Sequence, residues 1–239
     1  MDILGNNHQA LTFSNNDLRQ QLKFEDDQNF ATMLQMTAGE VKKFEVFVTP
    51  IFDGFIGDTG FTPDLTERKS IVSQLLNGLK QLKDANKCHN DLKPNNILYQ
   101  KTNNSYSIRI ADFGQCGGKG GTPGWTAPIF HRERQSGKED MFSVGWLCLR
   151  SLCESKSLFL SLRDNYVEHT NEPWMASFRS MIEIEFVQMM VDLNSPTSVV
   201  EIIDHWNRIK SSVQIIDINR LRDIGVPENN LRLQLKRPR

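Results

Sequence analysis

A polar run near the middle of the chain constrains its fold more than any other feature. It reads His89-Asn90-Asp91-Leu92-Lys93-Pro94-Asn95-Asn96, and a second motif, Asp112-Phe113-Gly114, begins 21 residues beyond Asp91. The segment 107–110, just before the second motif, has the apolar character of a short strand. Turns favour Asp, Asn and Pro, so either motif alone would indicate an ordinary polar turn. The two motifs together, in this order and with a strand leading into the second, indicate a functional site rather than an ordinary turn.

The two motifs resemble the H-x-D-L-x-x-x-N and D-F-G motifs of eukaryotic-type serine/threonine protein kinases, specifically of their large C-terminal lobe. The resemblance implies an α+β, protein-kinase-like fold with a mostly helical large lobe and a β-containing small lobe. It also implies ATP and Mg²⁺ as cofactors, and transfer of the γ-phosphate of ATP to serine or threonine of a protein substrate. Such a transfer makes few covalent demands on the protein and depends on alignment and charge neutralisation.

The resemblance also assigns roles to particular side chains. Asp91 would take the proton of the incoming hydroxyl, and Lys93 would hold the γ-phosphate as a point charge. The Thr122 hydroxyl would touch both of them. Asn96 and Asp112 offer the hard oxygen ligands that Mg²⁺ prefers when it also binds nucleotide phosphates. Lys93 followed directly by proline resembles serine/threonine-specific rather than tyrosine-specific members of the family.

Two later segments fit the same family. Gly121-Thr122-Pro123-Gly124-Trp125 resembles the substrate-binding turn of serine/threonine kinases. The glycines around Lys119 do not form a P-loop, because Lys119 is followed by Gly rather than Ser or Thr. Asp140 begins a D-x-x-S-x-G match, which predicts a buried helix over 140–153 and a carboxylate that accepts backbone N–H bonds from the loop at His89.

Local patterns predict the helices that carry these motifs. Asp64 and Glu67 form a capping box at the start of a helix over 64–86, and Ser198 and Glu201 form a second one. The helix over 64–86 has apolar residues at helical spacing on one face: Val72, Leu75, Leu76, Leu79 and Leu82.

Two short strands, over 97–99 and 107–110, are predicted around the polar turn 101–104. Leu98 lies in the first of them. It resembles the residue that forms the floor under the adenine ring, and it equally suits an ordinary core leucine.

Residues 1–50 are predicted to be a small lobe that is truncated relative to the family. His8–Phe13 resembles the strand that carries the phosphate-pairing lysine, but Thr12 stands in the place of that lysine and no glycine-rich loop precedes it. Lys23 is a candidate substitute. Residues 24–34 have helical spacing and include acidic residues that would pair with the lysine, although a solvated helix start explains them equally well. An incomplete chain is an alternative explanation for the short amino terminus.

The domain boundaries follow from these assignments. Residues 44–52 alternate in the manner of a strand and would lead into the connection between lobes. The large lobe is predicted over 51–210. Residues 211–239 lie beyond the usual end of the family, finish with basic residues, and are predicted to be a partly ordered C-terminal tail.

Three positions depart from the family pattern. Asn90 replaces the arginine that receives a phosphate on the activation segment, so regulation by that route is not expected. Ile129 replaces the glutamate of A-P-E, and Ser195 stands where its arginine partner belongs. Loss of both partners together is physically coherent, because one buried charge without the other costs roughly 3–5 kcal/mol.

Composition gives information on partners, cellular location and membrane segments. The 239 residues carry 28 Lys and Arg against 29 Asp and Glu, which gives no reason to expect nucleic acid or an acidic membrane as partner. Four scattered cysteines without a C-x-x-C pair favour a reducing, cytoplasmic location. Residues 1–7 lack the form of a signal peptide. The apolar run 144–149 is stopped by Arg150 and is too short to span a bilayer.

Two functions remain in competition. The first is a protein serine/threonine kinase that acts on a protein substrate. The second is a catalytically impaired pseudokinase that serves as a binding or scaffold module for a protein partner. The enzyme is favoured by the presence of Asp91, Lys93 and Asn96 in the loop 89–96, called the catalytic loop below, together with Asp112 and Thr122. The small lobe that lacks an evident lysine favours the binding module.

Overall fold

The computed structural model describes the strand residues 9–14 and 43–48 and a larger set from residue 52 onward: 52–103, 105–116, 118, 121–127, 129, 137–168 and 172–231. The chain divides into two compact units, residues 2–51 and residues 52–239. In the first unit, β1 (Gln9–Ser14) pairs antiparallel with β2 (Lys43–Val48). The strands predicted over His8–Phe13 and from residue 44 are confirmed, and the second ends at Val48. The predicted helix over 24–34 and the candidate Lys23 lie outside the described residues.

A small antiparallel sheet belongs to the second unit. Its order is β3 (Gly54–Phe55), β4 (Ile97–Thr102) and β5 (Ser105–Ile110). Ile97 lies opposite Ile110, and Thr102 lies opposite Ser105. The two strands predicted around the polar turn are therefore confirmed, with a tighter turn than expected because β4 continues through Thr102. This hairpin brings the end of the catalytic-loop motif beside the start of the D-F-G motif.

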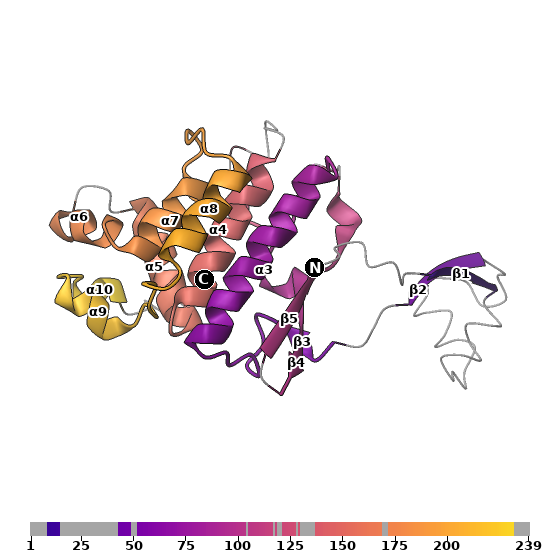
Figure 1. Ribbon diagram of the computed structural model, residues 1–239, viewed down its shortest axis with the longest axis horizontal. Helices are drawn as coiled ribbons and strands as arrows, with labels where there is room; N and C mark the ends of the chain where they lie inside the picture. The colour runs from indigo at the N-terminus through magenta and orange to yellow at the C-terminus, as the bar shows by residue number, and fades with distance from the viewer. Residues whose placement is uncertain are drawn as a thin grey trace, which may run out of the picture. The chain divides into compact units, whose positions relative to one another are not determined.

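Helices make up most of the second unit. Their bounds are α3 (Leu65–Asp84), α4 (Lys138–Leu152), α5 (Lys156–Glu168), α6 (Pro173–Arg179), α7 (Ile182–Val191), α8 (Val199–Ile209), α9 (Ile218–Asp223) and α10 (Glu228–Leu231). Figure 1 shows α4 between α3 and α7 in the middle of the helical layer, with the β3–β5 sheet beside α3. The predicted α+β class with a mostly helical lobe is confirmed.

The caps and the apolar face explain where α3 lies. The Asp64 side chain accepts from the Glu67 N–H at 2.8 Å, and Glu67 returns a bond to the Asp64 N–H at 2.7 Å, as the capping box predicts. The five apolar side chains predicted on one face are at most 2% exposed. Burial of one such side chain contributes about 1.5–3 kcal/mol, so this face fixes α3 against α4 and the sheet.

Helix α4 is the most enclosed helix of the described part. Twelve of its fifteen residues are buried, including the polar Asp140 and Ser143. Gly145 allows close packing on α7, because a Cβ at this position would lie 2.7 Å from Val191 Cγ1. A helix this deeply enclosed provides a rigid support for the loops that rest on its first turns.

The segment from residue 211 onward differs from the predicted tail. Through residue 231 it is helical in part and packed, with buried apolar side chains at Val213, Ile216, Leu221, Val226 and Leu231. Backbone bonds join it to the end of α4, since Glu154 N–H donates to the Ile216 carbonyl and Ile216 N–H donates to Leu152, both at 2.9 Å. Its apolar residues are too sparse to predict this packing from local pattern.

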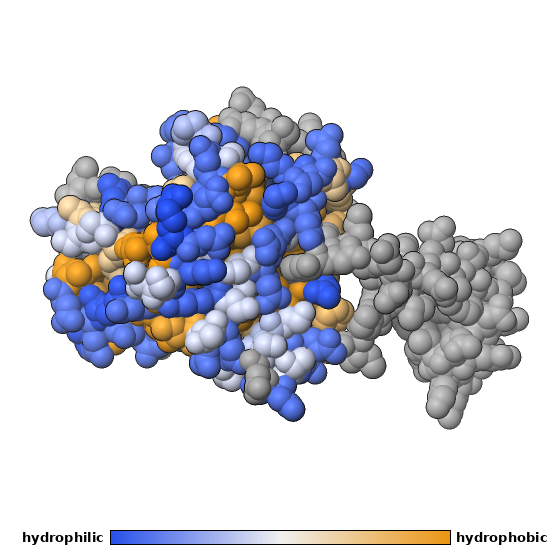
Figure 2. All heavy atoms as spheres, in the orientation of Figure 1, coloured by the Kyte–Doolittle hydropathy of each residue, from blue (hydrophilic) through white to orange (hydrophobic). Residues whose placement is uncertain are grey.

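Hydrophilic residues dominate the face of the molecule drawn in Figure 2, with small hydrophobic areas between them. Within the described residues, no helix combines the length and the hydropathy that crossing a bilayer requires.

Candidate active site

A buried carboxylate holds the catalytic loop on α4. Asp140, 2% exposed, accepts the backbone N–H of His89 at 2.7 Å and that of Asn90 at 2.9 Å. Burial raises the pKa of Asp140, and the two N–H bonds oppose that rise without cancelling it. Asn90 has φ of 67°, a left-handed conformation that asparagine tolerates better than most residues. The predicted contact between Asp140 and the loop is confirmed.

His89 connects the loop to the D-F-G segment. Its Nε2 lies 2.9 Å from the Ala111 carbonyl oxygen, and its Nδ1 lies 3.3 Å from the Asp91 backbone nitrogen. One neutral tautomer satisfies both contacts, with Nε2–H donating to Ala111 and Nδ1 accepting from Asp91. The imidazole also packs on the Phe113 ring, with 4.8 Å between centroids. His89 therefore fixes the two motifs in one mutual position.

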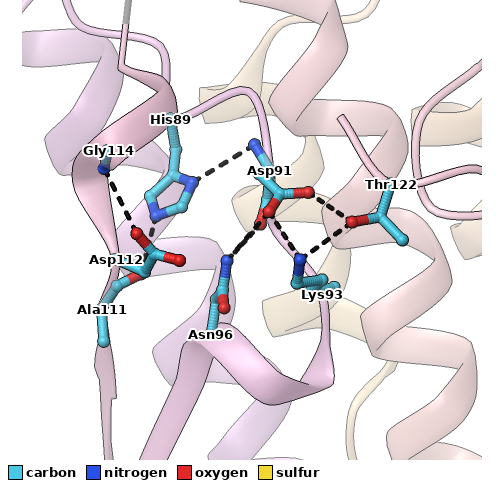
Figure 3. Close-up of polar contacts among 8 residues, drawn as sticks. All are labelled: His89, Asp91, Lys93, Asn96, Ala111, Asp112, Gly114 and Thr122. Carbon is cyan, nitrogen blue, oxygen red and sulfur yellow. Dashed lines mark hydrogen bonds and ion pairs between the residues drawn. The ribbon is translucent and has the colours of Figure 1, made fainter. Parts of the chain in front are cut away.

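Asp91, Lys93 and Thr122 form a hydrogen-bonded triangle (Figure 3). The Thr122 hydroxyl donates to Asp91 Oδ1 at 2.6 Å, and Lys93 Nζ donates to Asp91 Oδ2 at 2.7 Å and to Thr122 Oγ1 at 2.9 Å. Partial burial by itself raises the pKa of Asp91, but the hydrogen bonds from Lys93 and Thr122 and the Lys93 charge outweigh it, so the pKa is lowered. These contacts thus favour the ionised form of the carboxylate.

The turn that carries Thr122 is held by its backbone and by α4. The N–H groups of Trp125 and Thr126 donate to the Thr122 carbonyl at 3.0 and 3.1 Å. The Ser143 hydroxyl of α4 donates to the Trp125 carbonyl at 2.8 Å. Gly121 is required before the turn, because φ is 140° and a Cβ there would lie 2.3 Å from the Thr126 hydroxyl. The sequence analysis did not predict this contact of Ser143, although its position in the D-x-x-S-x-G motif could have indicated it.

Asn96 and Asp112 lie on the adjoining segments. The Asn96 amide donates to the Asp91 carbonyl at 2.8 Å and to Asp91 Oδ2 at 3.3 Å. Asp112 adopts a left-handed conformation with φ of 60°, and one of its oxygens accepts the Gly114 N–H at 3.4 Å. Figure 3 shows Asn96 beside Asp91, with Asp112 below His89.

The donor set of these two residues fits a magnesium ion. Within the described part of the chain, no hydrogen bond uses Asn96 Oδ1 or the second oxygen of Asp112. A group of three or more His, Cys, Asp or Glu side chains able to hold a metal does not occur among those residues. Mg²⁺ suits such a sparse set, because it is commonly held by one or two protein side chains together with water and phosphate oxygens.

Leu98 lies on β4, opposite Arg109 of β5 and Phe55 of β3. It is half-buried, whereas Ile97 and Tyr99 on either side of it are buried. The alternation places Leu98 on the other face of the small sheet from the core. Contact with an adenine ring stays a prediction for this residue.

The departures from the family pattern have local explanations. The Asn90 amide donates to the carbonyls of Cys88 at 3.3 Å and Gln115 at 3.1 Å, so it joins the loop to the segment after D-F-G. Ile129 is 40% exposed, and the Ser195 hydroxyl shares a hydrogen bond of 2.6 Å with Thr197. Neither of the last two side chains carries a charge, in agreement with the loss of both members of an ion pair, and the Lys138 ammonium donates to the Ser195 carbonyl at 3.0 Å. Thr12 lies in β1, opposite Glu45 of β2.

Comparison with known proteins gives a consistent result. The family described as "Protein kinase domain" matches residues 23–203. A probable serine/threonine-protein kinase, fhkB of Dictyostelium discoideum, is 33% identical over 126 residues, which cover 45% of this chain and 11% of that protein. The serine/threonine-protein kinase ATG1c of Arabidopsis thaliana is 38% identical over 96 residues, 36% of this chain and 13% of that protein.

A longer but weaker match is myosin light chain kinase A of Dictyostelium discoideum, 23% identical over 185 residues. It covers 70% of this chain and 63% of that protein. The chain spans less than two thirds of the length of each of these relatives.

Proposed function

Because this chain belongs to the protein kinase family, we propose that it transfers the γ-phosphate of ATP to serine or threonine side chains of protein substrates. The observation that carries the proposal is the triangle of Asp91, Lys93 and Thr122, closed by contacts of 2.6–2.9 Å. The Thr122 hydroxyl already donates a hydrogen bond to the Asp91 carboxylate. The site is therefore suited to receive a second hydroxyl, that of the substrate.

The roles of the side chains follow from their chemistry. Asp91 is the acceptor for the proton of the substrate hydroxyl, and its lowered pKa keeps it unprotonated at neutral pH. Lys93 supplies a positive charge beside that carboxylate for the transferred phosphate. Asn96 and Asp112 would hold Mg²⁺, which neutralises charge on the phosphates when it is bound. Leu98 is assigned to the adenine ring.

The second candidate function is a binding or scaffold module with impaired catalysis. The observation that favours it is Thr12, which stands in the sequence where the family carries its phosphate-pairing lysine. Loss of one charge-assisted hydrogen bond to a phosphate costs roughly 1.5–3 kcal/mol. This candidate therefore predicts weak binding of Mg-ATP, and it requires no proton acceptor at residue 91.

The substitution Asp91→Asn tests the proposal. The amide keeps the shape of the side chain but cannot accept the hydroxyl proton as a carboxylate does, so phosphate transfer is expected to fall by about 10²–10⁴. Transfer of radiolabelled phosphate from ATP to a generic protein substrate is the measurement. Asp204→Asn, the same substitution at an exposed position on α8, is the matched control and should leave transfer unchanged.

Equal incorporation of phosphate by the wild type and by Asp91→Asn would contradict the proposal, since the signal would then come from a contaminating kinase. The binding-module function would in that case be the better account of the chain.

A further inference from the structure

A cavity of about 330 Å³ adjoins the catalytic loop on the large unit. Pro94 and Asn95, the two residues between Lys93 and Asn96, form part of its wall. Trp125, from the turn that carries Thr122, forms another part. The remaining lining residues come from the β3 region, the end of α4 and the start of α5: Phe55, Gly57, Arg150, Lys156, Phe159 and Leu160. The cavity therefore lies beside both the loop that carries Asp91 and the turn that carries Thr122.

Much of the cavity wall is apolar and firmly packed. The Trp125 indole stacks on the Phe159 ring with 5.4 Å between centroids and 19° between planes. Arg163 reinforces this wall from behind, because its guanidinium lies 5.6 Å from the Phe159 centroid and donates to the Gly124 carbonyl at 3.1 Å. Such a wall accommodates the aliphatic part of a side chain.

The charge of the cavity has one sign. Arg150 and Lys156 are cations, and none of the described lining residues is Asp or Glu. Asp58, which follows Gly57, directs its carboxylate to the Phe55 N–H at 2.8 Å. Arg150 and Lys156 therefore have no carboxylate opposite them among the described lining residues, and Asn95 adds a polar amide to a mostly apolar wall.

Of the two cations in the cavity lining, Arg150 is the one that most strongly indicates a ligand. It is half-buried, and within the described residues its guanidinium has no hydrogen bond and no ion pair. Burial lowers the pKa of Arg150; the neighbouring Cys153 opposes this shift without cancelling it, and the charge of Arg68 adds to it. Arg68 is also half-buried, but it donates to the carbonyls of Pro63 at 2.9 Å and of Ser151 and Cys153 at 2.7 Å.

A partly desolvated guanidinium without a partner is unfavourable, and an anion supplied from outside would relieve the cost. Glu154 lines a smaller neighbouring cavity together with Arg68 and Arg150. It is exposed, and the described residues contain no ion pair between Glu154 and either arginine. Arg150 thus remains available to a ligand in the larger cavity.

We propose that this cavity binds an anionic side chain, a carboxylate or a phosphate, located a few residues from the serine or threonine that is phosphorylated. The inference rests on the proposed kinase function and names its substrate class: acidic or already phosphorylated protein segments. Arg150 is the principal contact, because its planar fork pairs with carboxylate or phosphate oxygens. Lys156 adds an exposed charge at the rim.

Peptides with one central serine in an otherwise neutral sequence provide the test. One position at a time, from five residues before the serine to five after it, is made Asp, phosphoserine, Ala or Lys. The measured quantities are kcat/KM for phosphate transfer and the Kd from fluorescence anisotropy of labelled peptides. At one position, or two adjacent ones, Asp or phosphoserine should improve both by about tenfold or more relative to Ala, chiefly through KM. The Asp and phosphoserine series tell the two sources of anion apart.

Variants of the full chain connect the preference to the cavity. Arg150→Gln should remove most of the advantage of the anionic peptide. The variant is expected to fold, because the substitution removes a partly buried charge and creates none. Arg150→Glu should transfer the advantage to the peptide with Lys at the same position, a reversal that general damage to the enzyme cannot produce. Arg208→Gln, an equal loss of charge on the exposed face of α8, should retain the wild-type preference.

The outcomes separate the inference from the proposed function. Turnover with equal kcat/KM for Asp, Ala and Lys peptides would overturn the inference and leave the kinase function intact. Anionic preference in binding that Arg150→Glu reverses, without any turnover, would support the cavity assignment and count against the kinase function. Equal binding of all peptides without turnover would overturn both.

Discussion

Asp91 and Asp140 are both buried carboxylates in contact with the same loop, yet their pKa values shift in opposite directions. Partial burial raises the pKa of Asp91, but the hydrogen bonds from Lys93 and Thr122 and the Lys93 charge overcome it, so the pKa is lowered. Asp140 receives two backbone N–H groups and no cation side chain, and there burial prevails. The two pKa values differ because Asp91 is less buried and gains the Lys93 ammonium and hydrogen bonds from Thr122 and Asn96, whereas Asp140 accepts backbone N–H groups from the loop.

The substitution Lys93→Met should therefore raise the pKa of Asp91 relative to the wild type, because burial is then opposed by fewer favourable contacts. In the wild type the folded-state pKa lies below the ordinary value of 3.8, so the contribution of Asp91 to stability is complete above pH 3.8 and is lost as the pH falls through the folded-state pKa. In the variant the folded-state pKa lies closer to the ordinary value, so the contribution of Asp91 to stability above pH 3.8 should be smaller.

Carboxyl ¹³C chemical shifts of Asp91, followed during an acid titration, measure the change in pKa directly. Lys80→Met, which removes a cation from the exposed pair with Asp84, provides the control and should leave the Asp91 titration unchanged. An Asp91 curve that is identical in Lys93→Met and the wild type would refute the electrostatic role given to Lys93.

The packing of α4 against α7 depends on a glycine whose position in the helix is otherwise unfavourable. A Cβ at Gly145 would approach Val191 Cγ1 to 2.7 Å and Met190 Cβ to 3.0 Å, and the branched valine has little freedom to move. Gly145→Ala should reduce the free energy of unfolding by about 1–3 kcal/mol, as overpacking of a close interface does. Urea denaturation monitored by circular dichroism measures this difference.

The same substitution in α3 gives a matched comparison. A Cβ at Gly78 would lie 3.0 Å from the terminal Cδ1 of Ile110, which can rotate away at low cost. The gain in helix propensity from Gly to Ala, about 1 kcal/mol, should then leave Gly78→Ala neutral or more stable. Equal losses of stability at the two positions would show that the contact with α7 is not what requires Gly145.

At the scale of elements, the sequence predicted what depends on local pattern. The capping box at Asp64, the apolar face of α3 and the strands around residue 102 follow from interactions between near neighbours, and each is confirmed. The hydrogen bonds from the loop at His89 to Asp140 could be predicted from the D-x-x-S-x-G motif. Helices α9 and α10 were not predicted, because they are short and owe their order to tertiary contacts that no local period encodes. The cavity beside Pro94 was missed for the same reason, since four separated segments form it.

In the large unit, the segment 211–231 is joined to the helical lobe by a buried ion pair. The Glu183 side chain on α7 is fully buried, and Arg220 of α9 approaches it with Nη2 to Oε2 at 3.2 Å and Nη1 to Oε1 at 3.3 Å. The Gln214 N–H also donates to Glu183 at 2.8 Å. Ser161 and Asn230 make a further contact between α5 and α10. These bonds join parts of the chain that lie on either side of the predicted boundary at residue 210.

Removal of Arg220 alone should therefore destabilise the whole unit, because it leaves the Glu183 charge buried with the Gln214 N–H as its one remaining partner among the described residues. Arg220→Met is expected to reduce the free energy of unfolding by about 3 kcal/mol, at the lower end of the range for buried pairs because Arg220 is partly exposed. Glu183→Gln combined with Arg220→Met removes both charges and should recover part of that loss. Arg222→Met, at an exposed pair on the same helix, should change stability by less than about 1 kcal/mol. Chemical denaturation of the full chain measures all three. A cooperative transition that is unchanged in Arg220→Met would mean that residues 211–231 are a separable tail after all.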